Sequence, residues 1–246
     1  MKILQIPLKA KIGHFKVNYT TASKLSYDIP TFTVIEGIIG AIMGWNRSDY
    51  RYKIKRDSAK FGIIIRSPIQ KAIYAINAPN ELITPMSLFS DKKKSASAIK
   101  DRTQLYTELL IDPAYTILFS HNDENLYREV KSQVLAKKSV YNIYLGSAFC
   151  IAEYDGEPEE IEIEKVKITK SEVISVIDLN YVKEDINWDA NTKMITDNIP
   201  YLKDPDLTIR KYKQVIYNPL AEPINCSGDF YHYKDNKYIY LFEGSE

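Results

Sequence analysis

The chain has 246 residues, of which 45% are hydrophobic and 26% charged, with 33 Lys and Arg against 32 Asp and Glu. This composition excludes a disordered chain, a collagen repeat and a disulfide scaffold, and the length suits one large domain or two small ones. No apolar run reaches the roughly 20 residues of a membrane helix, and the first residues lack the features of a signal peptide. We therefore expect a cytoplasmic protein without a membrane partner.

The charges are distributed unevenly along the chain. Residues 1–110 hold 18 Lys and Arg against 8 Asp and Glu, whereas residues 111–246 hold 15 against 24. An imbalance this long predicts a basic face that meets a polyanion and an acidic part that meets a basic neighbour or water.

The first quarter of the chain predicts a strand, a long loop and a helix. Residues 4–12 alternate between apolar and polar side chains, which indicates a strand with one buried face. Residues 13–30 are too polar to pack and too long for a tight turn, so we expect a functional loop there. Thr33 and Glu36 are expected to form a capping box for a helix over residues 34–43, and Gly44 is expected to end it.

The next elements follow from short apolar runs and one amphipathic segment. The Asp-Pro pair at 112–113 joins two of the predicted strands, and the polar, basic residues 90–102 predict a protrusion. Strands are expected at 61–65, 72–78, 103–111, 114–119 and 144–154, with a helix capped by Asn122 before the last of them.

This order predicts an α+β fold of the ferredoxin-like (RRM-like) βαββαβ type. The ferredoxin-like domain spans residues 1–155 and carries the basic insertion at about 88–104. An acidic segment that begins at Gly156 marks a boundary, and residues 156–246 form a smaller β-rich part.

Motifs for cofactor or metal chemistry are missing from the sequence. There is no glycine-rich nucleotide loop and no paired metal-binding carboxylates, and the three histidines are too scattered for a zinc site. We expect no metal and no cofactor, and we expect Cys150 and Cys226 to be buried free thiols.

What remains is a mixture of basic and aromatic side chains on predicted loops. Lys and Arg neutralise phosphates while aromatic rings stack on splayed bases, so the mixture favours single-stranded RNA. With 19 Tyr in the chain, a Tyr near a Lys is also expected by chance, and a solvated flexible loop is an equally plain alternative for the lysines at 92–94. The candidate RNA-binding residues are His14, Lys16, Tyr19, Tyr27, Arg47, Arg51, Lys53, Lys92, Lys93, Lys94 and Arg102.

His14 is also a candidate catalytic residue. A metal-independent ribonuclease needs a His that deprotonates a 2′-hydroxyl and a Lys that stabilises the charged phosphorane. Lys11 and Lys16 are close to His14 in sequence, but a single loop His is more often a binding or exposed residue.

Several segments together resemble the CRISPR-associated protein 5 family of the repeat-associated mysterious protein superfamily. They keep the order expected for the family and span most of the chain. The matching segments are residues 13–16, 26–30, 36–44, 102–104, 109–115, 144–147, 215–219 and 228–231.

The resemblance implies a non-catalytic, type I-B-like subunit of the Cascade surveillance complex that caps the 5′ handle of the guide crRNA. It also implies that residues 90–102 are the family's thumb, which leans on the adjacent backbone subunit, and that the acidic second half meets other subunits, including the large one. DNA would be met only through the complex. Type I-C relatives cut RNA with a His, Lys and Tyr set, and the match at His14 and Lys16 is too loose to transfer that activity.

Two alternatives remain open at this point. One is a metal-independent endoribonuclease that processes the CRISPR precursor RNA with His14. The other is an RNA-binding module outside CRISPR defence.

Overall fold

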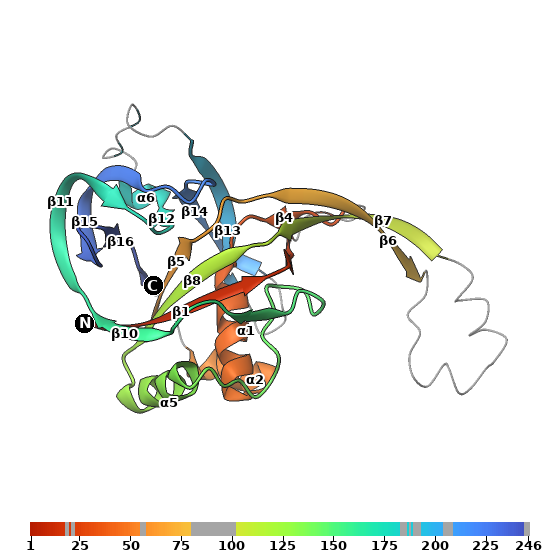
Figure 1. The fold of residues 1–246 in the computed structure, drawn as a ribbon, viewed down its shortest axis with the longest axis horizontal. Coiled ribbons are helices and arrows are strands. Elements are labelled where there is room, and N and C mark those ends of the chain that lie inside the picture. The colour runs from red at the N-terminus through yellow and green to blue at the C-terminus, as the bar shows by residue number, and fades with distance from the viewer. Residues whose placement is uncertain are drawn as a thin grey trace.

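The computed structural model describes residues 1–17, 20, 23–54, 58–79, 102–182, 186, 188, 193–203 and 209–243. The fold is mixed α/β and rich in strands, with one six-stranded antiparallel sheet at its centre (Figure 1). This sheet has the order β10-β1-β8-β5-β17. Both β9 and β10 pair with β1. Its strands are β1 (Lys2–Ala10), β5 (Ala59–Ile65), β8 (Ala114–His121), β9 (Ala152–Tyr154), β10 (Glu159–Glu162) and β17 (Phe242–Glu243).

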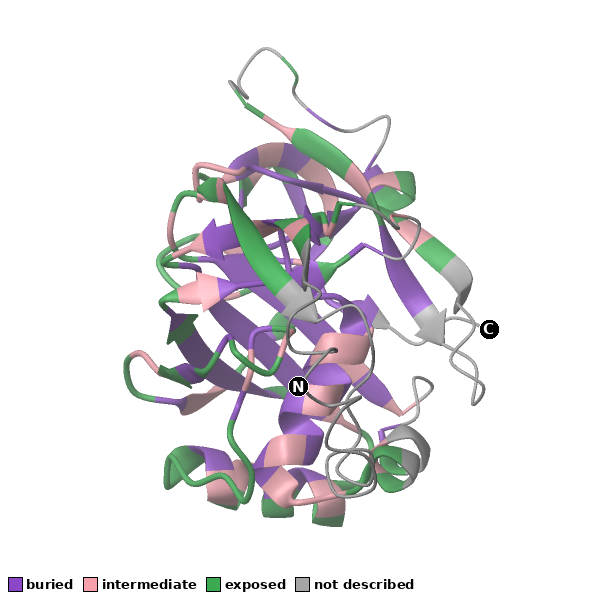
Figure 2. Cartoon of the chain, turned by 90° about the vertical axis from the view of Figure 1, so that its right-hand side faces the viewer, coloured by how far each residue is buried: buried purple, intermediate pink, exposed green. Residues whose placement is uncertain are grey.

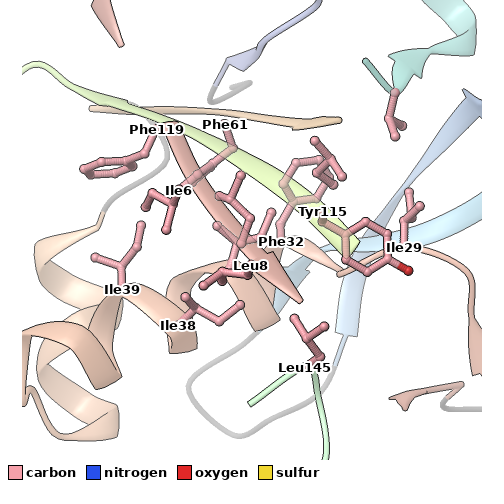
Figure 3. Close-up of a cluster of buried hydrophobic side chains, with 14 of the residues drawn as sticks. Ile6, Leu8, Ile29, Phe32, Ile38, Ile39, Phe61, Tyr115, Phe119 and Leu145 are labelled. Carbon is pink, nitrogen blue, oxygen red and sulfur yellow. The ribbon is translucent and has the colours of Figure 1, made fainter. Parts of the chain in front are cut away.

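The period-two pattern of β1 is confirmed, but its second face is covered as well. Leu4, Ile6 and Leu8 belong to the core between the sheet and the helices, where Figure 3 shows two of them among aromatic rings from β5 and β8. Gln5 is also buried, and its Oε1 accepts a hydrogen bond of 2.6 Å from the Tyr233 hydroxyl. The expectation of one solvent-facing side was therefore wrong for most of the strand.

Three helices lie on one side of the central sheet. Helices α1 (Phe32–Met43) and α5 (Glu124–Leu135) contact each other, and α2 (Arg47–Lys53) packs on α1 (Figure 1). The glycines of α1 leave room for the ring of Tyr50 from α2. A Cβ on Gly40 would lie only 2.6 Å from Cδ1 of that ring. Gly44 ends α1 in the left-handed conformation, as expected, with φ of 71°.

Both predicted helix caps were misplaced. The N-cap of α1 is Thr31, whose hydroxyl lies 3.1 Å from that of Thr33 and makes no capping bond. The N-cap of α5 is Asp123 rather than Asn122, because its carboxylate accepts hydrogen bonds from the backbone of Asn125 and Leu126.

The segment expected to be an unpacked loop contains short strands and buried side chains. β2 (Ile12–Gly13), β3 (Phe15–Lys16) and β4 (Ser26–Tyr27) lie within it, and β3 pairs with β4. Phe15, Tyr27 and Ile29 are buried in the main core. Single apolar residues within a polar run turn inward here, which a count of polar residues could not show.

A two-stranded ribbon extends from the body of the protein. Figure 1 shows β6 (Lys71–Pro79) and β7 (Arg102–Ile111) leaving the central sheet together, with β2 paired to the base of β7. β7 and β8 do not pair with each other, because the turn at Asp112, with φ of 44°, passes the chain from the ribbon to the central sheet. Most of the protrusion predicted at 90–102 lies outside the described residues, and β7 begins at its last residue, Arg102.

The predicted strand over 144–154 is present only as β9. The residues before β9 form a loop with two isolated bridges, from His14 to Gly146 and from Tyr144 to Ile151. Through the bridge to His14, this loop is part of the candidate site.

Part of the C-terminal strands packs on the face of the central sheet that the helices leave uncovered, whereas the strand over residues 195–203 contacts α1 and joins the main core. Ile3, Leu118 and Tyr231 share a core across this contact, and a separate apolar cluster fills the C-terminal layer itself. β10 and β17 belong to the central sheet, so that sheet includes strands from beyond Gly156. The remaining elements are β11 (Glu164–Val173), β12 (Ile177–Asp178), α6 (Leu179–Val182), β13 (Ile195–Lys203), β14 (Ile209–Tyr217), β15 (Ile224–His232) and β16 (Tyr238–Ile239).

Burial follows this layering. Figure 2 shows the strands at the centre of the molecule as buried, while the helices alternate between buried and more exposed residues. Among the described residues, no helix has the length and apolarity to cross a membrane.

Candidate nucleic-acid interface

His14 lies inside the protein rather than on an exposed loop. Only 3% of it is exposed, and its Nδ1 is 2.9 Å from the backbone oxygen of Glu108 in β7. A buried imidazole in this position cannot stack on a base or reach a 2′-hydroxyl in the described conformation. The predicted contact of His14 with RNA is therefore corrected to a structural role beneath the surface.

The loop before β9 holds His14 through the backbone. The His14 N–H donates to the oxygen of Leu145, and the Ser147 N–H donates back to the oxygen of His14, over 3.0 and 3.2 Å. Gly146 sits between these two bonds with φ of 92°, and a Cβ there would lie 2.0 Å from the His14 oxygen. Only glycine allows this close approach of two chain segments.

Burial and two nearby lysines set the charge state of His14. Burial lowers the pKa of His14 below its usual value, the hydrogen bond with the Glu108 backbone opposes this, and Lys24 and Lys16 lower it further. We conclude that His14 is held neutral within a basic neighbourhood.

Lys16 and Lys24 form the exposed part of this neighbourhood. Lys16 is exposed at the end of β3, and Lys24 is half-buried beside β7, where its backbone bonds to Tyr106 and Glu108. Within the described ranges, neither ammonium group has an ion-pair partner. Both cations are therefore free to meet phosphate.

A partly buried ionic cluster lies below the same surface. The Lys71 Nζ is 2.5 Å from Asp28 Oδ1 and 2.8 Å from Glu108 Oε1, and it also donates to the backbone oxygen of Ser26. Burial opposes the charge of Lys71, but hydrogen bonds with the two carboxylates raise its pKa above the usual value. The cluster ties the end of β4 to the base of the β6–β7 ribbon.

Two tyrosines extend this cluster to the C-terminal layer. The Tyr217 hydroxyl at the end of β14 donates to Asp28 Oδ2 over 2.9 Å, and the Tyr115 hydroxyl donates to the Asp28 backbone oxygen over 2.5 Å. Burial is the main cause that raises the pKa of both phenols above the usual value. The negative charge of Asp28 raises it further. The sequence alone does not reveal these contacts, because neither tyrosine is near Asp28 along the chain.

Three of the other predicted RNA-binding residues, Tyr27, Arg47 and Lys53, have described side chains. Tyr27 is 2% exposed and faces the core, so it presents no ring to a base. Arg47 and Lys53 are exposed on α2, where the Lys53 Nζ lies 4.6 Å from the centre of the Trp45 ring. Figure 1 shows α2 beneath the sheet and β4 near the base of the ribbon, so the structure separates these cations from Lys16.

The remaining candidates cannot be placed as side chains. Tyr19 and the lysines at 92–94 lie outside the described residues. Arg51 in α2 and Arg102 at the start of β7 have a described backbone, and nothing is assigned to their side chains.

Sequence reasoning missed an aromatic residue on the loop that holds His14. Phe149 is 52% exposed at the tip of a turn, whereas Leu145 and Cys150 on either side are fully buried. An exposed Phe flanked by buried positions is not visible in composition, and no periodicity marks it.

A cavity of about 500 Å³ lies away from these residues, at the start of α5. Two of its cations are paired, Arg128 with Glu124 and Lys131 with Glu160, and Lys2 and the N-terminal ammonium also line it. No group of three or more His, Cys, Asp or Glu side chains in the described part of the chain could hold a metal ion.

The architecture defines the class of protein: a strand-rich α/β fold that presents two lysines, unpaired among the described residues, beside the base of a two-stranded ribbon. Among solved structures, it is similar to a CRISPR protein from Archaeoglobus fulgidus, with 7% identity, a TM-score of 0.57, and 99% of this chain and 100% of that chain covered. It is also similar to a chain of a CRISPR RNA-guided surveillance complex (12% identity, TM-score 0.48, 91% of each chain). A third similar structure is a functionally uncharacterized protein from Streptococcus mutans (14% identity, TM-score 0.44, 92% of this chain and 91% of that one).

Residues 3–218 match the family model described as CRISPR-associated protein (Cas_Cas5). The chain belongs to this family, which confirms the resemblance seen in its sequence. The comparison with curated proteins finds no match.

Proposed function

We propose that this chain is a non-catalytic RNA-binding subunit of a type I Cascade complex that caps the 5′ handle of the guide crRNA. The observation that carries the proposal is the match of the CRISPR-associated family over residues 3–218. Family membership also sets aside an RNA-binding role outside CRISPR. The closer assignment to type I-B stays a prediction from the sequence motifs.

The topology supports a ferredoxin-like core for this role. The chain order is β1, α1, β5, β8, α5, then β9 and β10, and the strands neighbour one another as β9 and β10, β1, β8, β5. This is the order that a βαββαβ unit adopts when its helices cover one face. The β6–β7 ribbon is inserted between β5 and β8, where the thumb insertion was predicted.

The electrostatics of the candidate interface support single-stranded RNA as the ligand. Lys16 and Lys24 are unpaired within the described residues, and the Lys24 backbone bonds to that of Tyr106, which is 55% exposed. Cations beside an exposed aromatic residue are the combination that single-stranded RNA uses. Arg47 and Lys53 on α2 form a second basic site, which would meet a different part of the RNA.

The position of His14 argues against the nuclease alternative. A general base has to reach the proton it removes within about 3 Å, directly or through one water. His14 is almost fully buried and its Nδ1 is taken by a backbone oxygen. Without an accessible base beside them, Lys16 and Lys24 favour RNA binding over RNA cleavage.

The partners follow from the same proposal. The ribbon would contact the adjacent backbone subunit, the acidic second half would contact other subunits such as the large one, and target DNA would be met only through the complex. Each of these contacts stays a prediction.

Purification of the tagged chain from its native host, followed by sequencing of bound RNA, tests the proposal. We expect guides that share one 5′ handle, and no defined cut when the pure chain is incubated with repeat RNA and a chelator. A heterogeneous RNA population, or a 2′,3′-cyclic phosphate product, would contradict the capping role.

A further inference from the structure

The turn that carries Phe149 has the properties of a binding surface. Phe149 is 52% exposed and Ile151, two residues later, is 61% exposed. The turn is closed by a hydrogen bond of 2.9 Å from the Cys150 N–H to the oxygen of Ser147. An exposed aromatic ring on a closed turn offers a flat face on which a nucleobase can stack.

The turn is held firmly in place. The Leu145 N–H donates to the Cys150 oxygen over 2.9 Å, and both side chains are fully buried. The backbone bonds between His14 and this loop fix the turn against β3. A rigid aromatic residue loses little conformational entropy on binding.

The charge next to this turn selects the kind of ligand. Ser147, at the start of the turn, is hydrogen-bonded to His14, and His14 is two residues from Lys16 and within electrostatic range of Lys24. Neither lysine has an ion-pair partner within the described residues. An apolar protein partner would not need two unpaired cations, whereas a single-stranded nucleic acid needs a stacking ring beside phosphate-binding cations.

We propose that Phe149 is a stacking surface for one nucleobase of single-stranded RNA, whose flanking phosphates contact Lys16 and Lys24. This inference rests on the proposed function and assigns the base-contacting residue within it. The buried loop segment fixes the ring, and the two lysines set the path of the backbone.

Two probes of equal charge separate stacking from electrostatics. One is an oligoadenylate of about eight nucleotides, and the other is an oligomer of the same length made of abasic ribose-phosphate units. Phe149→Ala should weaken oligoadenylate binding by about 5- to 150-fold and leave abasic binding unchanged. The double variant Lys16→Ala/Lys24→Ala should weaken both probes alike.

The controls use the same loop and the same position. Tyr141→Ala removes an aromatic residue that is 57% exposed but is held to Ala41 at the end of α1, and it should change neither affinity. Phe149→Trp should keep most of the affinity, and its added fluorescence should be quenched by oligoadenylate but not by the abasic oligomer.

The outcomes distinguish this inference from the proposed function. If the wild-type chain binds neither probe, the RNA-binding function itself fails. If the wild-type chain binds oligoadenylate and Phe149→Ala binds it equally well, only the stacking role is overturned. Unchanged RNA affinity combined with impaired assembly of Phe149→Ala would assign the turn to a protein partner instead.

Discussion

His14 shows how a residue that looks catalytic in a sequence can serve as a structural group. Its ring fills the space between the loop before β9 and β7, and its Nδ1 bonds to the Glu108 backbone. Burial lowers the pKa of His14 and also that of His121. The unfolded chain therefore takes up protons on these histidines at a higher pH than the folded chain does.

The first prediction is a loss of stability on mild acidification. As pH falls from about 7 to about 5, protons bind the unfolded histidines first, so the free energy of unfolding should fall. His14→Asn keeps a side-chain nitrogen near the Glu108 oxygen but cannot titrate, so its unfolding free energy should depend less on pH. Urea unfolding across this pH range measures the difference, and equal slopes for variant and wild type would contradict the buried, neutral His14.

The second prediction concerns the close approach at Gly146. Gly146→Ala places a Cβ 2.0 Å from the His14 oxygen at a positive φ, so unfolding should become easier by at least about 2 kcal/mol. Gly37→Ala, in the interior of α1, is the matched control. Its Cβ would lie 4.0 Å from the Tyr50 hydroxyl, which is an ordinary van der Waals contact. The control should gain up to about 1 kcal/mol from helix propensity. A stable Gly146→Ala protein in thermal unfolding would show that the two segments do not pack this way.

At the scale of elements, the ionic cluster around Lys71 joins parts that are far apart in the chain. Lys71 is in β6, Glu108 is in β7, Asp28 follows β4, and Tyr217 ends β14. The base of the ribbon is thereby fixed to both the N-terminal segment and the C-terminal layer.

The third prediction is that Lys71→Met destabilises the fold by about 2 to 3 kcal/mol. Removal of the cation leaves the Asp28 and Glu108 carboxylates without a neutralising charge, and the cost is below that of a fully buried pair because 30% of the Lys71 side chain is exposed. Lys137→Met is the control, since its pair with the exposed Glu157 should contribute less than about 1 kcal/mol. Chemical denaturation compares the two variants, and equal losses would mean that the cluster adds no stability.

The fourth prediction concerns the segment that the ribbon carries. Removal of residues 91–101 should leave cooperative unfolding intact, because the sequence there has no apolar periodicity with which to pack. It should impair assembly with backbone subunits on guide RNA, measured by size-exclusion chromatography. A broadened unfolding transition would place this segment in the folded core.

At the scale of the whole molecule, two layers cover the two faces of one sheet, and the basic side chains lie at its margins. Lys16 and Lys24 lie near the base of the ribbon, while Arg47 and Lys53 lie on α2 across the helical layer. RNA that follows the first margin need not touch the second.

The fifth prediction is a steep salt dependence of RNA binding. If about five phosphates are neutralised, the logarithm of the affinity should fall with the logarithm of salt at a slope near −3.5. Lys16→Ala/Lys24→Ala should reduce the magnitude of this slope by about 1.4, because each lost phosphate contact removes about 0.7. Lys137→Ala/Lys138→Ala, directly after the end of α5, should leave the slope unchanged, and a slope near zero for the wild type would exclude phosphate-driven binding.

The sequence by itself determined the local elements and the family. Alternation over residues 4–12 predicted β1, Gly44 marked the end of α1, and the ordered motifs identified the CRISPR-associated family. These signals are local, because side-chain period and backbone freedom depend on near neighbours in the chain.

Only the tertiary structure decided which polar residues are surface and which are interior. His14 and Tyr27 have the composition of an RNA-binding loop, yet long-range strand pairing buries both, while Phe149 looks like core and is exposed. Asp28 has no visible partner in sequence, because Lys71 and Tyr217 reach it only after distant strands have packed. Burial and ion pairing depend on contacts across the fold, and the spacing of residues along a chain does not encode them directly.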